Sequence, residues 1–454
     1  MNLPKPFVDA MSCKLSTEEL DLFTAALASD APVSIRQNRY KKSNHSLSNE
    51  SVDWCPSGLY LSQRPKFTLD PLFHAGAYYV QEASSMIMWT ILEKLNLSTI
   101  NIRVLDLCAS PGGKSTLIAS FLDKKGLLVS NEMVKNRAYT LKYNMCKEGY
   151  ANVVVTNNAP SDFSRLSEFF DVILVDAPCS GEGLFRKNND AIGEWSPDAV
   201  EQCATRQEQI LQDIVPCLKP GGHLIYSTCT YNDAENINNV HWACENFDFR
   251  SIAVDFPESW QVVSIAKGKS LGYQCYPHKL RGEGLFVSVL QKHEDKQPFD
   301  HKVPKHHKII VPTDPKWRGI LDGWLQNTNF SFWIDKMGTI HAVPLHIEQD
   351  LLILAQYLKL IYCGISMGVI KNKDLIPDHS LALSLDLSKK IVTHELSERD
   401  ALHYLKKQLT HIECPTKGWL LMTYNGLGLG WAKNIGDRIN NYLPADYKIH
   451  MEID

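Results

Sequence analysis

The stretch VLDLCASPGGKST, residues 104–116, decides the fold because it joins an apolar strand, a loop of small residues and a helix. The same alternation continues on both sides of it. Apolar runs typical of strands occupy 103–107, 127–131, 152–156, 171–175, 222–227 and 285–290. Segments with helical spacing lie between them, at 80–95, 114–122, 134–148 and 199–218. This alternation predicts an α/β domain with a parallel, doubly wound sheet and helices on both faces.

Length and composition limit the class of protein. The chain has 454 residues, enough for about three domains. Its 44% hydrophobic and 22% charged residues exclude a disordered or collagen-like chain. The net charge of −4 excludes a globally basic protein, but not local basic faces. We expect no secretory signal. The apolar stretch 351–370 is typical of a helix followed by a buried strand, so we expect no membrane span there. We expect a cytoplasmic protein whose thiols are reduced.

The glycine-rich loop admits three interpretations. A Walker A loop fits Gly113, Lys114 and Ser115 but requires a glycine where Cys108 stands, and a dinucleotide-binding G-x-G-x-x-G is absent. The third is a loop for S-adenosylmethionine, whose small residues let the backbone approach the cofactor. Such a site needs an acidic residue near the end of the second strand, and Glu132 stands there. A solvated carboxylate is the alternative for Glu132.

Two cysteines follow the predicted ends of the fourth and fifth strands. Cys179 lies in DAPCSGEG, residues 176–183, and Cys229 lies in STCTYNDAEN, residues 227–236. Both should reach the rim where such sheets bind ligands. Most cysteines are small buried hydrophobes, and we keep that interpretation for five others. These are Cys108, Cys146, Cys203, Cys217 and Cys244.

Methylation of cytosine at C5 is a reaction that needs these groups. A thiolate adding to C6 makes C5 nucleophilic, which is covalent catalysis. A hydrogen bond at N3 stabilises the charge that develops in the ring. A base must then remove the C5 proton so that the thiolate can leave. Two cysteines and one aspartate, such as Cys179, Cys229 and Asp176, suffice for these steps.

The three segments resemble those of the Nol/Nop/Sun family of RNA (cytosine-5) methyltransferases, which carry a C-A-A-P-G-G-K-T-like loop, D-A-P-C-S-G-x-G and S-T-C-T-x-x-x-x-E-N. The resemblance implies that Cys229 is the nucleophile, that Cys179 assists proton removal and product release, and that Asp176 contacts the cytosine and the cofactor. It implies a Rossmann-like core that binds S-adenosylmethionine through Glu132, Asp176 and the loop. The loop residues are Cys108, Ala109, Ser110, Pro111, Gly112, Gly113 and Lys114.

Other positions extend the resemblance and contain one departure. Arg186 and Lys187 match basic family positions near the active site, and 276–278 with 282–286 resemble the closing segment of the catalytic domain. The family has an aspartate after the third strand, where this chain has Ala159. Either Asn158 or Asp162 is the expected replacement.

The chain divides into a catalytic part and flanking regions. We expect an N-terminal RNA-binding or lead-in domain to residue 98, helical up to about residue 75 with a capped helix over 15–27. The methyltransferase domain spans 99–295, and a Pro-, Lys- and His-rich linker spans 296–317. A middle α+β domain occupies 318–385. A region resembling PUA-like RNA-binding domains occupies 386–454, with a hairpin at Asn425-Gly426.

Two features of the flanking regions leave interpretations open. The run SIRQNRYKKSN, residues 34–44, is either a solvated face or an arm that contacts phosphates. The linker histidines His301, His306 and His307 lack Cys or His partners at zinc spacing, so we expect no metal site.

The expected activity is methylation of cytosine C5 in RNA, with small-subunit ribosomal RNA as the substrate and a monomeric enzyme. Transfer RNA is the alternative substrate. A non-catalytic ribosome-assembly factor is an alternative role, but it would need neither thiol. A methyltransferase for small molecules or proteins and a dithiol redox enzyme also remain open. Because the charge is near neutral, we expect RNA to be recognised by shape and by modest basic patches, with an affinity that falls as salt rises.

Overall fold

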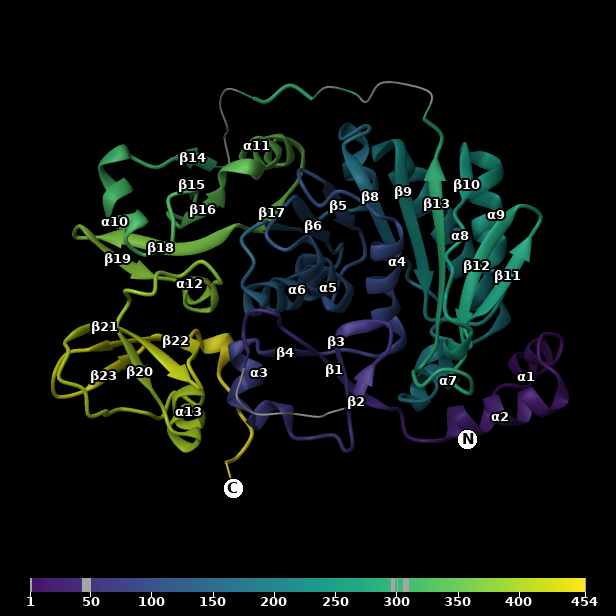
Figure 1. The fold of residues 1–454 in the computed structure, drawn as a ribbon, viewed down its shortest axis with the longest axis horizontal. Helices are drawn as coiled ribbons and strands as arrows, with labels where there is room; N and C mark the ends of the chain where they lie inside the picture. Colours follow the sequence, from purple (N-terminus) through teal and green to yellow (C-terminus); the bar gives the residue numbers. More distant parts are fainter. Residues whose placement is uncertain (1, 43–49, 295–298, 300, 305–309, 454) are drawn as a thin grey trace.

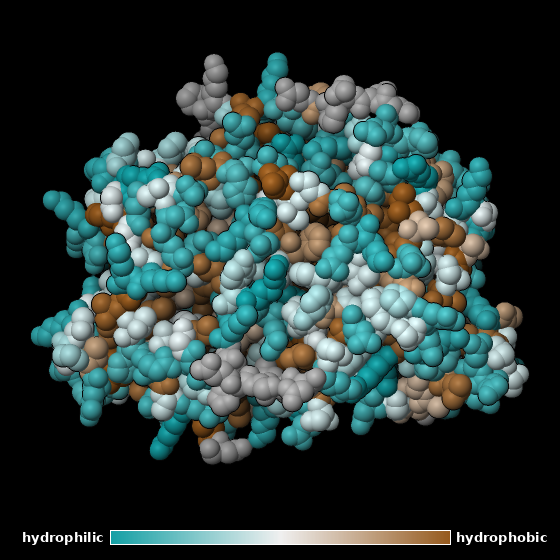
Figure 2. Space-filling view, in the orientation of Figure 1, coloured by the Kyte–Doolittle hydropathy of each residue, from teal (hydrophilic) through white to brown (hydrophobic). Residues whose placement is uncertain are grey.

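The computed structural model describes residues 2–42, 50–294, 299, 301–304 and 310–453. Four sheets organise this part of the chain (Figure 1). The largest extends from the middle to the right of this view, with the N-terminal sheet below its middle part and two C-terminal sheets to its left. The face in Figure 2 is mixed, because polar side chains surround small groups of apolar ones.

Five parallel strands form the centre of the large sheet, in the order β9-β8-β5-β6-β7. Their bounds are Arg103–Asp106 (β5), Leu127–Asn131 (β6), Val153–Thr156 (β7), Phe170–Asp176 (β8) and Leu218–Thr228 (β9). The edges are antiparallel. They consist of β10 (Phe249–Ser251), β11 (Val263–Lys267), β12 (Ser270–Cys275) and β13 (Leu285–Lys292) on one side and β17 (Leu360–Cys363) on the other. The predicted parallel, doubly wound sheet is confirmed at its centre.

Helices cover both faces of this sheet, because successive side chains of a strand point to opposite sides. Val104 of β5 packs in a core with one set of helices and Leu105 in a core with another. The first set is α4 (Met88–Lys94), α5 (Gly113–Leu122) and α6 (Lys135–Glu148). The second is α8 (Pro197–Ile214), α9 (Ile237–Asn246) and α11 (Glu348–Tyr357).

The N-terminal region is helical only at its start. α1 (Lys5–Ser12) and α2 (Thr17–Ala28) are followed by an antiparallel sheet in the order β2-β3-β1-β4. The strands are β1 (Val33–Gln37), β2 (Glu50–Val52), β3 (Cys55–Leu61) and β4 (Tyr78–Val80), and α3 (Pro71–Ala75) precedes β4. The expected helical lead-in up to residue 75 is therefore wrong. The strands are short, and Pro56 and Gly58 interrupt the alternation that would reveal them.

The helix expected over 80–95 is also shorter than predicted. Tyr78–Val80 pair with β1, and this tertiary pairing excludes a helix there. A 3₁₀ turn over Ser84–Ile87 leads into α4. The Glu82 carboxylate accepts the N–H groups of Ser84 and Ser85, each at 2.8 Å, and so sets where the turn begins.

The C-terminal half forms two further sheets. The first contains β14 (Ile310–Pro312), β15 (Phe330–Asp335), β16 (Ile340–Pro344), β18 (Ile365–Lys371) and β19 (Asp374–Pro377), with α10 (Arg318–Asp322) and α12 (His379–Leu383). The second contains β20 (Thr393–Glu395), β21 (Gly418–Tyr424), β22 (Leu427–Asn434) and β23 (Ile439–Asn441), with α13 (Glu398–Leu405). The predicted hairpin at Asn425-Gly426 is confirmed, and both turn residues have positive φ.

The C-terminal half also completes the large sheet. The stretch 351–370 contains the predicted helix and buried strand, but its first strand, β17, pairs antiparallel with β7. The expected linker, 296–317, contains β14 and a 3₁₀ turn over Pro315–Trp317. In the part of the chain that the structure describes, no helix is long and apolar enough to cross a membrane.

Buried cations join the N-terminal sheet to α6. Arg36 is fully buried, and its guanidinium pairs with Glu148 at 2.9 Å. Lys147 is 3% exposed, and its Nζ lies 3.6 Å from the centre of the Phe73 ring with no hydrogen-bond acceptor among the described residues. Burial lowers the pKa of Lys147 to about 7.

We expect Lys147→Met to raise the urea midpoint of unfolding at pH 6.5 and to raise it less at pH 9.5. An unfolded chain restores the ordinary lysine pKa of 10.5. Between pH 7 and 10.5 the unfolded state therefore binds more protons, so the stability of the wild type rises with pH and the advantage of Met shrinks. Lys336→Met, at an exposed position, is the control and should change neither midpoint. An equal rise of the urea midpoint at both pH values would contradict a free-energy cost of burying the charged Lys147 side chain.

Candidate active site

The loop after β5 leads directly into the N-terminus of α5. Gly112 has φ +118°, a left-handed conformation that favours glycine, and α5 begins at the next residue. Asp106, the last residue of β5, is fully buried and its Oδ2 accepts the Ser115 hydroxyl at 2.7 Å. Burial raises the pKa of Asp106 to about 7. Its Oδ1 has no partner among the described residues.

Glu132 stands directly after β6, beside this loop, and is 5% exposed. Its Oε1 accepts the N–H of Val134 at 2.8 Å, and its Oε2 lies 3.3 Å from the Arg137 guanidinium. The side chain is therefore held in place and is not a solvated strand-end carboxylate.

Asn131 ties together the loops that follow three neighbouring strands. Its amide donates to the carbonyls of Leu107 at 3.1 Å and of Asn158 at 3.0 Å. Its Oδ1 accepts the N–H of Asn158 at 3.1 Å. Sequence reasoning missed this residue, because its role appears only when β5, β6 and β7 lie side by side.

The two expected replacements at the third strand contact each other. Asp162 Oδ2 accepts the Asn158 amide and the N–H of Ala159, each at 3.0 Å. Asn158 Oδ1 accepts the N–H of Lys359 at 3.0 Å, so the segment that precedes β17 supports this loop. Ala159 contributes a backbone group here.

The two thiols meet at the carboxyl ends of β8 and β9. These strands are parallel neighbours, with Asp176 opposite Ser227. Cys179 lies three residues beyond β8 and Cys229 one residue beyond β9, and their Sγ atoms are 3.1 Å apart. Contact with Cys229 and burial raise the pKa of the Cys179 thiol well above its usual value. Cys179 therefore remains protonated near neutral pH.

Asp176 links the thiol pair to the glycine-rich loop. Its Oδ2 lies 2.8 Å from Lys114 Nζ, and its Oδ1 accepts the Ser227 hydroxyl at 2.7 Å. Burial opposes the charged form of Lys114, but the Asp176 carboxylate outweighs this effect and raises the pKa of the lysine. The structure thus brings Cys179, Cys229, Asp176 and Lys114 together at one edge of the sheet.

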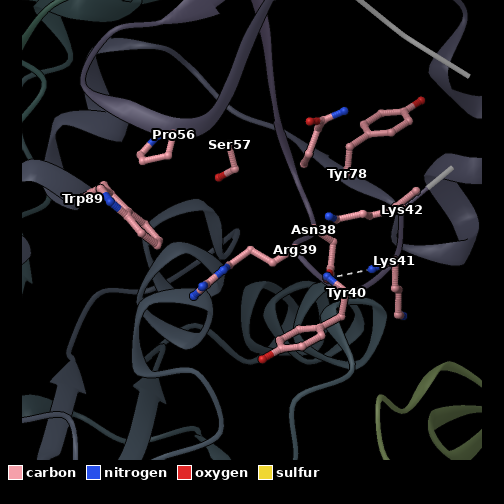
Figure 3. A pocket seen from close by; sticks show the side chains of 11 residues that line it. Asn38, Arg39, Tyr40, Lys41, Lys42, Pro56, Ser57, Tyr78 and Trp89 are labelled. Carbon is pink, nitrogen blue, oxygen red and sulfur yellow. Dashed lines mark hydrogen bonds between the residues drawn. The ribbon is translucent and has the colours of Figure 1, made fainter. Parts of the chain in front are cut away.

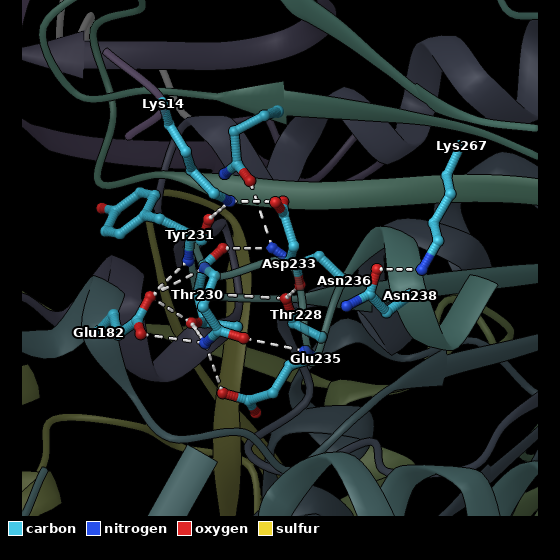
Figure 4. A network of polar contacts seen from close by, with 12 residues as sticks. Lys14, Glu182, Thr228, Thr230, Tyr231, Asp233, Glu235, Asn236, Asn238 and Lys267 are labelled. Carbon is cyan, nitrogen blue, oxygen red and sulfur yellow. Dashed lines mark hydrogen bonds and ion pairs between the residues drawn. The ribbon is translucent and has the colours of Figure 1, made fainter. Parts of the chain in front are cut away.

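A polar network fixes the two loops that carry the thiols (Figure 4). Glu235 is fully buried and accepts the N–H of Ser180 at 3.0 Å, from the loop that contains Cys179. Glu182, also from that loop, accepts the N–H of Tyr231 at 2.7 Å, from the loop that contains Cys229. Burial raises the pKa of Glu235. Neither glutamate was singled out from the sequence, although Glu235 belongs to the quoted STCTYNDAEN segment.

Gly183 permits a close approach of these loops. Its N–H donates to the carbonyl of Cys229 at 2.7 Å, and a Cβ at this position would lie 2.4 Å from the same oxygen. No real Cβ atom occupies such a position, so a side chain here must displace the Cys229 backbone.

We expect Gly183→Ala to lower the single-turnover rate of methyl transfer by about tenfold to a hundredfold, because small displacements of reacting groups are costly. Binding of S-adenosylmethionine, measured by calorimetry, should be retained. Gly193→Ala is the matched control, since a Cβ there meets no atom within 4 Å. Equal rates for Gly183→Ala and the wild type would show that the close approach of Gly183 to the Cys229 carbonyl is not needed for methyl transfer.

Basic side chains line a cavity of about 810 Å³ beside the Cys179 loop. Arg186 and Lys187 follow that loop, and Arg64 and Arg281 reach the cavity from other segments. Lys187 pairs with Glu283 at 2.5 Å, and Arg186 donates to the Gly282 carbonyl at 3.0 Å. The segment 282–286 therefore contacts this wall through Gly282 and Glu283. Tyr276, from 276–278, packs against Tyr231 in an apolar core that also contains Phe185.

The remaining candidates that the structure describes form no second site. All twelve cysteines are free, and burial raises the pKa of each of the five that we interpret as buried hydrophobes. These are Cys108, Cys146, Cys203, Cys217 and Cys244. His301 contacts the Ser167 carbonyl at 2.7 Å, while His306 and His307 lie outside the described residues. Within the described ranges, no group of three or more His, Cys, Asp or Glu side chains could hold a metal ion.

Comparison with known proteins decides the family. A family model of the 16S rRNA methyltransferase RsmB/F matches residues 93–291. The N-terminal domain of 16S rRNA methyltransferase RsmF matches 3–83, and the methyltransferase RsmF PUA domain matches 391–449. Ribosomal RNA small subunit methyltransferase F of Aliivibrio fischeri is 30% identical over 98% of this chain and 97% of its own. The chain belongs to this methyltransferase family.

A second relative agrees with the RsmB/F assignment, and two solved structures share the fold. The methyltransferase F of Pectobacterium carotovorum is 31% identical over 98% of this chain and 96% of its own. A methyltransferase homologue from Pyrococcus horikoshii has a TM-score of 0.53 at 26% identity, over 64% of this chain and 95% of its own. NSun6 from the same organism, solved with SFG, has a TM-score of 0.52 at 20% identity, over 64% of this chain and 99% of its own. At this identity it shows the fold alone.

This member of the RsmB/F family is therefore an RNA methyltransferase that depends on S-adenosylmethionine. The predicted family resemblance, fold class and cofactor are confirmed. The residues present fit the cofactor, because the loop before α5 offers backbone groups without bulky side chains, and a held carboxylate, Glu132, follows the next strand. The PUA domain implies that RNA is the substrate.

Proposed function

We propose that this enzyme methylates C5 of a cytidine in the RNA of the small ribosomal subunit, through a covalent bond between Cys229 Sγ and cytosine C6. The observation that carries the proposal is the pair of thiols, 3.1 Å apart, beside the Asp176–Lys114 ion pair. A methyltransferase that attacked an oxygen or an exocyclic nitrogen would need neither thiol. Cytosine C5 needs one thiol to activate the ring and a second group to remove a proton.

The surroundings of the two thiols support different roles for them. Because the pKa of Cys179 is raised, we assign its S–H as the donor toward Cys229 Sγ. Donation from Cys179 stabilises a thiolate at Cys229, which is the form that attacks C6. Once Cys229 is bonded to the ring, Cys179 loses its S–H proton to solvent, and the resulting Cys179 thiolate accepts the C5 proton after methyl transfer. Cys229 then leaves C6 as a thiolate.

Asp176 and Lys114 contribute electrostatic stabilisation in this proposal. Addition of a thiolate places negative charge on the ring, and a hydrogen bond at N3 stabilises it. We assign this bond to the Asp176 carboxyl group, which donates to N3 a proton that it receives from the Lys114 ammonium, 2.8 Å away. Its other contact, the Ser227 hydroxyl, fixes its orientation.

The cofactor, when bound, supplies an electrophilic methyl group on sulfur. We propose that Glu132 holds its ribose hydroxyls, and that Asp176 and the loop after β5 hold the rest of it. The loop residues are Cys108, Ala109, Ser110, Pro111, Gly112, Gly113 and Lys114. Asn158 or Asp162 would face its adenine end in place of Ala159.

Ribosomal RNA is the proposed substrate because the relatives named above act on small-subunit rRNA and match this chain over nearly its full length. The cavity lined by Arg64, Arg186, Lys187 and Arg281 supports an approach of phosphates to the Cys179 loop. We propose a monomeric cytoplasmic enzyme. Its proposed divisions are an N-terminal region to 98, a catalytic domain over 99–295, a linker over 296–317, a middle domain over 318–385 and a PUA-like domain from 386.

Nucleoside analysis tests the proposed substrate and position. Methyl-labelled S-adenosylmethionine and the enzyme are incubated with unmodified small subunits, naked 16S rRNA or transfer RNA, and the RNA is digested to nucleosides. We expect label in 5-methylcytidine from the small subunit or its rRNA. Label only in transfer RNA would favour the alternative substrate, label in another nucleoside would contradict C5 chemistry, and no label would favour an assembly factor.

We expect Asp176→Asn to lower the single-turnover rate by about a hundredfold, because an amide cannot pass a proton from Lys114 to N3 as the ring becomes negative. Asp171→Asn is the matched control. It breaks a similar pair with Lys219, 2.5 Å apart, at the other end of the same strand. An unchanged rate in Asp176→Asn would exclude the assigned contact at N3.

A further inference from the structure

The basic run over residues 34–44 separates into structural and exposed cations. Arg36 is buried against Glu148, as described above. Lys41 is also buried, and its Nζ donates to the carbonyls of Ala75 at 3.0 Å and Lys147 at 2.6 Å. Arg39 and Lys42 are exposed. Only these two cations of the described run remain for a ligand in solution.

Arg39 and Lys42 line a cavity of about 770 Å³ (Figure 3). Arg39 lies between Trp89 on one side and Tyr78 and Lys42 on the other. The volume is within the range of about 300–1,000 Å³ that is typical of small-ligand pockets. No Asp or Glu side chain is among the described residues that line it. The cavity is therefore positive and partly aromatic.

Two side chains that line this cavity have N–H donors without an acceptor among the described residues. The Arg39 guanidinium lies 6.0 Å from the centre of the Trp89 ring, and one of its nitrogens, Nη1, donates to the Ser120 carbonyl at 3.1 Å. The structure gives the guanidinium no other acceptor among the described residues. The indole N–H of Trp89, a side chain that is 7% exposed, also has no partner among them.

A second cavity, of about 530 Å³, continues from the first toward the C-terminal domain. The two cavities share Tyr40 and Lys41. The second is lined also by Lys124, Lys389 and the hairpin tip at Gly426, again with no acidic residue among its described lining. Because they share these two residues, the cavities adjoin, and we call the pair the groove; it is lined from the N-terminal sheet to the PUA domain.

The groove is separate from the proposed active site. Arg39 contacts Ser120, and Tyr40 donates its hydroxyl to Asp123, both at the C-terminal end of α5. The glycine-rich loop lies at the other end of this helix, about 15 Å away for ten residues.

We propose that this groove binds a single-stranded segment of the substrate RNA that flanks the target nucleotide, with phosphates on Arg39 and Lys42 and a base against the exposed ring of Tyr40. Cations combined with aromatic rings are the usual elements of a single-strand site. An A-form duplex presents its bases stacked and paired, so they cannot enter a concave cavity. The inference rests on the proposed function in that RNA is the substrate, and it adds a binding site remote from the thiols.

Equilibrium binding without turnover tests the groove. The anisotropy of a labelled twelve-nucleotide oligouridylate is measured with the full chain, with the double variant Arg39→Gln/Lys42→Gln and with Lys269→Gln. Lys269 is exposed in the turn between β11 and β12 and serves as the control for loss of charge. We expect about tenfold weaker binding for the double variant and a salt slope smaller by about 1.4, since each single-strand phosphate contact contributes about 0.7.

Several outcomes would overturn the proposal. These are equal affinities for the double variant and the wild type, an equal loss for Lys269→Gln, and equal binding of a duplex of the same length. Displacement of the oligonucleotide by polyglutamate at the same charge concentration would indicate an acidic protein partner instead. Calorimetry with S-adenosylmethionine verifies that the double variant is folded. The experiment measures RNA binding and not methyl transfer, so its result remains valid even if the proposed methylation of cytosine C5 is wrong.

Discussion

Cys229→Ala is expected to abolish methyl transfer to RNA, with a loss of at least about 10⁴-fold, the scale on which removal of a catalytic nucleophile acts. Without a thiolate at C6, cytosine C5 remains too poor a nucleophile to attack the methyl group. The Cys229 side chain lies against Cys179, and the proposed cofactor ligands come from other loops. Binding of S-adenosylmethionine should therefore be unchanged, and calorimetry measures it beside the rate.

Cys203→Ala is the matched control for this variant. Cys203 is a partly buried thiol on α8, and it should retain full activity when replaced. Turnover by Cys229→Ala above about one hundredth of the wild-type rate would contradict its role as the nucleophile.

Cys179→Ala is expected to accumulate a covalent protein–RNA complex. The variant keeps Cys229, so the ring can still be attacked and methylated. It lacks the group that we assign to removal of the C5 proton, so Cys229 cannot leave. Turnover should fall by about 10²-fold to 10⁴-fold, the usual contribution of general acid–base catalysis. A denaturing gel with unmodified RNA and S-adenosylmethionine measures the complex as a slowly migrating band.

The double variant Cys179→Ala/Cys229→Ala provides the control for that band. It lacks both thiols, so no complex should form. Normal turnover of Cys179→Ala without a band would exclude the second-thiol role. A band that persists in the double variant would place the covalent bond at another residue.

The centre of the fold could be predicted from the sequence because its signals are local. A buried strand, a loop of small residues and a helix follow one another within 104–116, and the parallel order follows from repeating this unit. The two thiols could be placed near each other for the same reason, since each one follows the end of a strand. Their separation of 3.1 Å could not, because it depends on the pairing of β8 with β9.

The elements that sequence reasoning missed depend on distant contacts. The buried strand β17 could be predicted, but its pairing with β7 could not, because the two lie about two hundred residues apart along the chain and nothing local marks the partner. The N-terminal sheet consists of short strands that gain their stability from pairing. Asn131 and Glu235 act through hydrogen bonds to other loops, so their identities alone did not distinguish them from ordinary polar residues.

Trapping with 5-fluorocytidine tests the central claim most directly. The enzyme and S-adenosylmethionine are mixed with small ribosomal subunits reconstituted from RNA that contains 5-fluorocytidine. Fluorine cannot leave C5 as a proton does, so the bond between protein and RNA should persist after methyl transfer. We predict a slowly migrating band on a denaturing gel whose peptide map places the nucleotide on Cys229. An absence of this band, in a preparation that binds S-adenosylmethionine and methylates unmodified subunits, would contradict the covalent mechanism.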